Sequence, residues 1–97
     1  MTTEEIQNSL NKLFNSRLVK QEIPEVISIR VHNVKESHLG SINIDAMVFV
    51  GEDTEWGLPK RIELRELCEH IMRMIGLTSS DRIFFNTVRI KDEKRRD

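Results

Sequence analysis

Two histidines are the residues in this sequence best suited to chemistry. His32 and His38 stand six residues apart in the stretch RVHNVKESHLG. A neutral imidazole can bind a divalent metal ion, and its titration near neutral pH also suits proton transfer. Zinc needs three or four ligands in a tight tetrahedron, so this pair would need an acidic residue as well. A divalent-metal sensor is therefore one hypothesis, and a hairpin loop is the alternative.

Cys68 and His70 are the next candidates for metal binding, but their spacing separates them. They lie two positions apart in a segment that is predicted to be helical. This spacing turns the two side chains about 200° away from each other. We therefore expect Cys68 in the core and His70 on the flank of the helix. The sequence predicts no metal site and no cofactor.

A further candidate site combines Arg30, His32, Asn43 and Asp45, which are predicted to share one face of two neighbouring strands. A histidine beside an aspartate can do general acid–base work. Polar residues on the outward face of a strand are also the ordinary solvated arrangement, so catalysis and an interface role both stay open. No GxGxxG, Walker, GxSxG, HExxH or CxxC motif accompanies them.

Two helices are predicted from apolar periodicity. Residues 3–18 carry one apolar stripe, and Thr2 and Glu5 form a capping-box pattern at its start. Residues 60–75 carry a second stripe, and Gly76 suits a left-handed stop. The sequence thus predicts two amphipathic helices, one at the start of the chain and one after its middle.

Three strands are predicted from alternation, over residues 25–34, 41–50 and 82–90. A short polar loop ending in Gly40 joins the first two, which predicts an antiparallel hairpin. The third strand is apolar on both sides and its neighbour in the sheet is left open. The inner face of the first strand is expected to carry Ile27, Ile29 and Val31.

The predicted fold class is α+β, in the order helix–strand–strand–helix–strand, with two helices on one face of a three-stranded mixed sheet. Residues 1–90 form a single domain, and residues 91–97 form a charged, frayed tail. The helices can cover only one face of such a sheet. Its other face is therefore expected to lie open.

That outer face is predicted to carry large apolar side chains, namely Met47, Phe49 and one aromatic of the pair at 84–85, taken as Phe85. Exposed apolar patches of this kind mark interfaces. A three-stranded sheet also has two open edges, which a second copy could pair. We expect these residues to anchor an interface, with Arg30 and Asp45 at its rim.

Composition limits the partners. Among 97 residues, 15 basic and 16 acidic side chains give a net charge of −1, which argues against a general electrostatic grip on nucleic acid. No apolar run approaches the roughly 20 residues that cross a bilayer, and no signal-peptide pattern opens the chain. A single cysteine, Cys68, suits a reducing compartment. We expect a cytoplasmic protein that forms a homo-oligomer or binds a protein partner, without nucleic acid or membrane insertion.

The only tryptophan, Trp56, lies in an acidic loop with Glu52, Asp53 and Glu55. An indole offers a large apolar surface and one polar N–H group. Trp56 could therefore cover the end of a helix, or it could serve as a binding anchor.

The segment LCEHIMRMIGLTSSDRIFFN resembles the helix–turn–strand of the tautomerase superfamily, which includes macrophage migration inhibitory factor. The resemblance implies a trimer that pairs through an aromatic-rich strand. The catalytic residue of that family is an N-terminal proline, whereas this chain has Thr2 there, so no catalytic residue is carried over. The element order is also similar to ring-building modules of secretion and sporulation complexes and to the cytoplasmic domains of cation-diffusion transporters, all of which associate through strands or sheet faces.

The interpretation we prefer is a small non-enzymatic assembly or adaptor domain. It would self-associate or dock a protein partner through the outer sheet face and an open strand edge. One alternative is a tautomerase-like small enzyme or ligand-binding protein that uses His32, Asp45 or Arg30 in place of the proline. The other is a divalent-metal-sensing domain that uses His32 and His38.

Overall fold

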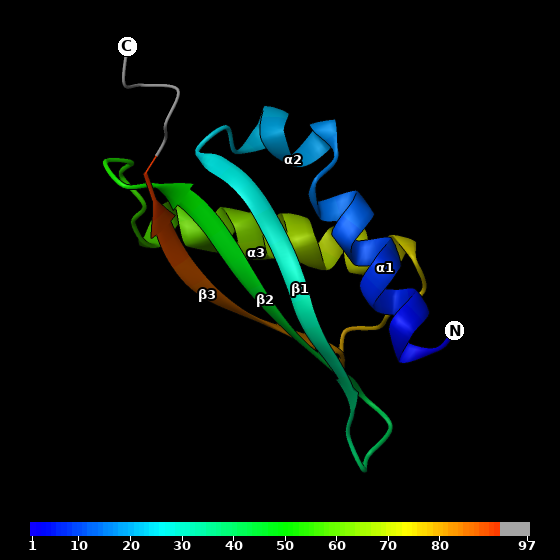
Figure 1. The fold of residues 1–97 in the computed structure, drawn as a ribbon. Helices are drawn as coiled ribbons and strands as arrows, with labels where there is room; N and C mark the ends of the chain where they lie inside the picture. The colour runs from blue at the N-terminus through cyan, green and yellow to red at the C-terminus, as the bar shows by residue number, and fades with distance from the viewer. Residues whose placement is uncertain (92–97) are drawn as a thin grey trace.

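A computed structural model describes residues 1–91 of the chain (Figure 1). Its helices and strands, in chain order, are α1 (Thr3–Phe14), α2 (Arg17–Glu22), β1 (Val26–Glu36), β2 (Ile42–Gly51), α3 (Leu58–Met74) and β3 (Arg82–Ile90). The predicted α+β class is confirmed. Apart from its first residue, the predicted tail lies outside the described residues.

The sheet has the strand order β1-β2-β3. The hairpin makes β1 and β2 antiparallel, as predicted, while β3 runs parallel to β2 after the crossover through α3. The strand that neighbours β3, left open by the sequence, is therefore β2. Figure 1 shows α3 crossing one side of the sheet and α1 running alongside β1. The opposite side of the sheet faces the reader.

The first helix ends at Phe14, earlier than predicted, because the side chains of the next two residues form hydrogen bonds with backbone groups. The Ser16 hydroxyl donates to the Leu13 carbonyl at 2.7 Å, and the Asn15 amide turns to the backbone of Ile29. Short polar side chains of this type compete with the helical backbone for hydrogen bonds. The chain therefore starts again as the short helix α2, which buries Val19.

Two β-bulges in β1 change which residues face the core. The pairing with β2 shifts between Val26 and Ser28 and again between Val31 and Asn33. Because each bulge inserts one unpaired residue, the alternation restarts after it. The prediction that Ile27 faces inward is therefore wrong, since its side chain is exposed. The inner face of β1 instead carries Val26, Ile29, Val31 and Val34.

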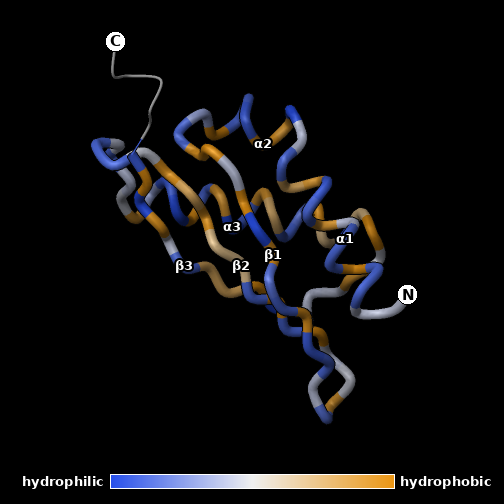
Figure 2. The backbone as a smooth tube through the Cα atoms, viewed as in Figure 1, coloured by the Kyte–Doolittle hydropathy of each residue, from blue (hydrophilic) through white to orange (hydrophobic). Residues whose placement is uncertain are grey.

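The hydrophobic core lies between the two long helices and the inner face of the sheet. The tube in Figure 2 shows apolar positions recurring along α1, α3 and the strands. Cys68 is fully buried there, as predicted, and burial raises the pKa of its thiol. The largest fully buried side chains are Phe14, Leu10, Ile23, Ile29, Ile44, Leu64, Ile71, Met72 and Ile83.

Helix α1 closes the outer edge of β1 with side-chain amides. Asn11 accepts a hydrogen bond from the Val31 N–H at 2.7 Å and donates to the Val31 carbonyl at 3.1 Å. Asn15 does the same for Ile29, at 2.9 and 2.7 Å. Gln7 also donates to the Val31 carbonyl, at 3.1 Å. These three amides, here called the amide ladder, replace the backbone groups that a further strand would offer.

The geometry of the amide ladder follows from the two repeat distances involved. Four residues of a helix rise about 6 Å, and two residues of a strand rise about 6.6 Å. Asn11 and Asn15 can therefore meet Val31 and Ile29, which lie two positions apart and point to the same side of β1. One of the two edges predicted to be open is consequently covered by the chain itself at Ile29 and Val31.

Candidate interaction surface

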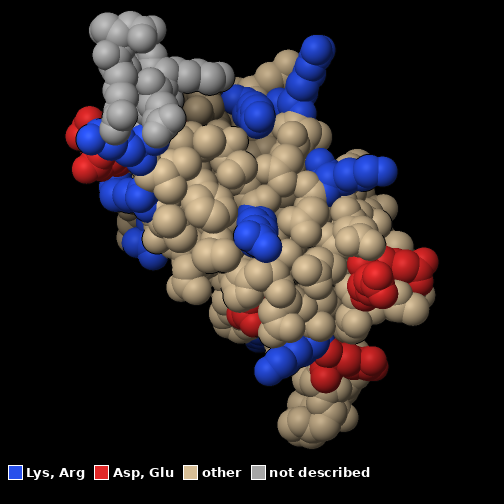
Figure 3. Space-filling view, in the orientation of Figure 1, with Lys and Arg blue, Asp and Glu red and all other residues tan. Residues whose placement is uncertain are grey.

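The outer face of the sheet carries apolar side chains that neither of the long helices α1 and α3 covers. Across the three strands, Met47 lies between Arg30 and Asn86, and Phe49 lies between Ser28 and Val88. Met47 and Phe49 are partly buried by their neighbours, yet neither packs against the core formed by the described residues. Figure 3, in which this face is toward the reader, shows a broad area over the sheet with few charged side chains.

Phe85 does not lie on that outer face, so this placement of a predicted anchor is wrong. The parallel register sets Phe85 beside Ala46, whose small, buried side chain leaves room for the ring beneath α3. The Arg65 guanidinium lies over the ring, 5.4 Å from its centroid. Phe84 takes the outward position instead, beside Asp45, and is 50% exposed. The outer face therefore still carries one aromatic of the pair.

Among the described residues, no hydrogen bond or ion pair joins His32 to Asp45 within the predicted polar cluster. The residue opposite Asp45 on β1 is Asn33, whose amide donates to the Asp45 carboxylate at 3.3 Å. His32 falls at the second bulge, where it is exposed and has no paired residue on β2. His38 is exposed in the hairpin loop. Within residues 1–91, no three His, Cys, Asp or Glu side chains gather closely enough to hold a metal ion.

The edge of β3 presents backbone groups that no described residue satisfies. The Ile90 carbonyl accepts from the Glu52 N–H at 2.8 Å, on the side of β2. Successive residues of a strand turn their backbone N–H and C=O groups to opposite sides. The groups of Phe85 and Thr87, which lie five and three residues before Ile90, therefore point away from β2. Apart from the ladder between β2 and β3, no backbone or side-chain hydrogen bond from residues 1–91 reaches these four groups. Nearer the start of β3, Arg65 donates to the Ile83 carbonyl.

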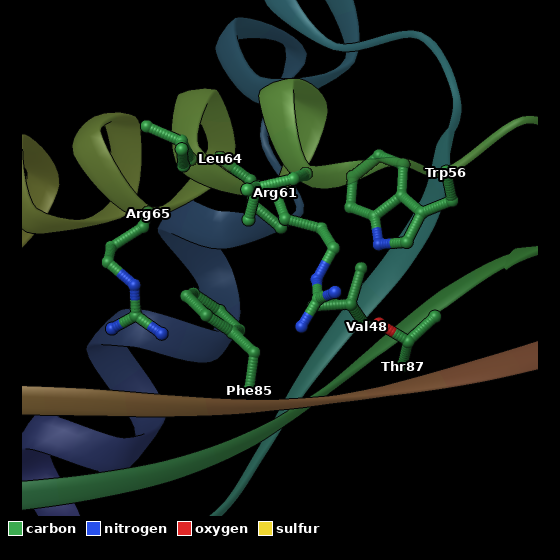
Figure 4. A pocket seen from close by; sticks show the side chains of 9 residues that line it. Val48, Trp56, Arg61, Leu64, Arg65, Phe85 and Thr87 are labelled. Carbon is green, nitrogen blue, oxygen red and sulfur yellow. The ribbon is translucent and has the colours of Figure 1, made fainter.

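A pocket lies beside this edge, between β3 and the first half of α3 (Figure 4). Its volume is about 110 Å³, and it adjoins a wider depression of about 390 Å³ that runs along Asn86 and Arg89. Neither space is lined by Arg30, His32 or Asp45. The apolar part of the pocket is formed by Val48, Trp56, Leu58, Ile62, Leu64 and Phe85.

Hydrogen-bond donors line the same pocket. Trp56 is 8% exposed, and its Nε1 atom is buried without a hydrogen-bond partner among the described residues. Figure 4 shows this edge of the indole and the guanidinium of Arg61 turned toward the same space. Arg89 donates to the Thr54 carbonyl at 2.6 Å, which ties the loop that carries Trp56 to β3. Trp56 thus both seals the core and lines a pocket.

The pocket was not anticipated from the sequence, although part of its signal was present. Leu58 and Ile62 lie four residues apart on α3, outside its buried stripe, and Arg61 and Arg65 repeat that spacing. Such a second stripe lies beside the first on a helix. The sequence alone did not show that this second stripe of α3 lies beside the edge of β3.

Comparison with protein-family profiles, with curated proteins and with solved structures gives no match. The resemblance to the tautomerase superfamily therefore stays a prediction. No helix among the described residues is both long enough and apolar enough to span a membrane.

Proposed function

We propose that this chain is an assembly or adaptor domain that binds a second copy of itself or another protein through the outer face of its sheet and the free edge of β3. The observation that carries the proposal is the apolar surface that both helices leave uncovered. It is formed by Met47, Phe49, Phe84, Val88 and Ile90, in register on β2 and β3.

The helices cover the two faces of the sheet unequally. Phe84 on β3 is 50% exposed, and Ile27 at the first bulge of β1 is 38% exposed. Water therefore contacts a large apolar side chain on each of the two strands that flank β2. Burying apolar surface contributes about 25 cal/mol per Å². A specific interface commonly buries about 800 Å² on each partner. Arg30 and Asp45, which flank the apolar surface, would supply a polar rim.

The mass of the protein in solution tests this proposal. We expect the wild-type chain to scatter light as a species heavier than its 11.4 kDa monomer, or to form a stable complex with a protein recovered from its source cells. Phe49→Lys places a charge at the centre of the apolar surface and should abolish either association. A far-UV spectrum and a urea unfolding curve establish that the variant is folded.

Leu39→Lys is the matched control, because Leu39 is also apolar and is 84% exposed at the tip of the hairpin. It should leave association unchanged. A wild-type chain that stays monomeric at high concentration and captures no partner would contradict the proposal. Equal loss of association in both variants would also contradict it, since the effect would then not be specific to the outer face.

A further inference from the structure

The free edge of β3 and the pocket beside it together have the form of a sheet that lacks one strand. Leu58 is 63% exposed and Ile62 is 47% exposed, and both lie on the part of α3 that lines the pocket beside β3. A fourth strand next to β3 would bring its inward side chains under these two residues. It would also pair the outward backbone groups of Phe85 and Thr87. The fold therefore offers both a hydrogen-bonding edge and an apolar cover for an added strand.

The size of the pocket favours a side chain over a whole metabolite. Pockets for small molecules commonly span about 300–1,000 Å³. The depression of about 390 Å³ falls within that range but is the more open of the two spaces. The pocket beneath α3 is smaller, at about 110 Å³. That space suits the end of one side chain, while the adjoining depression along Asn86 and Arg89 continues in the direction of the strand. An extended polypeptide would use both spaces.

The charge of the pocket indicates which side chain it would take. Arg61 and Arg65 line it, Arg89 lines the adjoining depression, and no acidic residue lines either. Within residues 1–91, no carboxylate oxygen lies within 4.0 Å of the Arg61 or Arg65 guanidinium. The Trp56 N–H adds a buried donor that still needs an acceptor. A carboxylate would satisfy these donors, and hydrogen bonds between charged groups are the stronger kind.

We propose that β3 accepts an extended segment of another polypeptide as a fourth strand, and that this segment carries an aspartate or glutamate whose carboxylate meets Arg61 and Trp56. Strand addition supplies main-chain hydrogen bonds, and pockets for alternate side chains supply specificity. This inference rests on the proposed function, because it names the partner of the β3 edge.

Selection from a library of random nine-residue peptides displayed on phage tests the inference with the full chain as bait. We expect the enriched peptides to alternate apolar and polar residues and to share one acidic position. The most enriched peptide, made synthetically, should change the fluorescence of Trp56, the only tryptophan in the chain. Replacing its acid by the matching amide should weaken binding about tenfold or more, the scale of a lost charged hydrogen bond.

Two variants separate the pocket from the edge. Arg61→Gln should weaken the peptide by a similar factor, whereas Arg73→Gln, an exposed arginine at the far end of α3, should not. Thr87→Pro removes an outward N–H without removing a bond to β2, so it should weaken the acidic peptide and its amide twin alike. If Thr87→Pro fails to fold, protection of the Phe85 and Thr87 amides from hydrogen exchange on peptide binding replaces it as the measurement of edge pairing.

Several outcomes would overturn the inference. They are no enrichment above an unrelated bait, enriched peptides without a shared acid, and equal binding to Arg61→Gln and Arg73→Gln. Saturable binding of benzoate or isovalerate that depends on Arg61, with no peptide enriched, would assign the pocket to a free carboxylate and also overturn it. None of these outcomes affects Phe49→Lys, so the outer face can still be judged separately.

Discussion

Replacing Asn11 by alanine tests whether the amide ladder holds the β1 edge. The variant loses the bond from the Val31 N–H, 2.7 Å long, and the bond to the Val31 carbonyl, 3.1 Å long. The carbonyl keeps its bond from Gln7, but the partly buried N–H is left without its partner. A net hydrogen bond contributes about 1 kcal/mol, and an unsatisfied buried donor costs about 1–3 kcal/mol.

We therefore expect the lost bonds to lower the free energy of unfolding by about 2 kcal/mol. Alanine also favours a helix over asparagine by about 0.5 kcal/mol, which offsets part of this loss. Asn8→Ala is the matched control, because Asn8 is exposed on the same helix and reports the propensity gain alone. The difference between the two variants, about 2 kcal/mol, then isolates the contribution of the ladder.

Urea unfolding at a fixed temperature measures the three free energies, with Trp56 fluorescence and far-UV circular dichroism as independent probes. Hydrogen exchange adds a local measurement. The Val31 amide should lose protection in Asn11→Ala, while the Ile29 amide, bound by Asn15, should keep it. The reasoning is refuted if the two variants are equally stable and the Val31 amide stays protected in both.

The remaining predictions concern single residues. Thr2→Ala removes the acceptor of the Glu5 N–H and should cost about 1 kcal/mol in urea unfolding. The hydrogen bond from the Thr2 N–H holds the pKa of the Glu5 carboxyl below its ordinary 4.5. The stability that the ionised Glu5 adds is therefore complete above pH 4.5 and is lost as the pH falls through the lowered pKa. Wild type and Glu5→Gln should consequently converge in stability in acid, as measured by urea unfolding. Gly76→Ala should destabilise by about 1 kcal/mol because φ is +97° there, again measured in urea. The buried thiol of Cys68 should react with an aromatic disulfide reagent far more slowly in the native chain than in denaturant, and fast native labelling would contradict its burial.

Local patterns predicted the elements of this fold well, because each depends on neighbours in the chain. The capping box of Thr2 and Glu5, the left-handed Gly76 and the span of β3 all lie as expected. The break after Phe14 was missed, since it depends on a contact between Asn15 and a strand that begins eleven residues later. The competing partner is visible only once both elements are placed.

The candidate site was less predictable because it depends on register. Adjacent phenylalanines at 84 and 85 must point to opposite faces, and only the pairing of Phe85 with the small Ala46 decides which one goes inward. The bulges at Ile27 and His32 likewise cannot be recognised from the sequence, because apolar and polar residues alternate both before and after each of them. The amide ladder could have been read from the spacing of Gln7, Asn11 and Asn15, but three polar residues on a helix also describe an ordinary solvated stripe.

The two sheet edges differ in what they offer to an added strand. A strand that adds to β3 could form a row of main-chain bonds, whereas one that approaches Ile29 or Val31 of β1 meets the side chains of α1. Two copies that pair β3 with β3 would each use the free edge of β3. Any further strand would then have to add along the part of β1 that the amide ladder does not reach. The N-terminal helix thus narrows the stretch of β1 at which another strand could pair, without any change to the sheet itself.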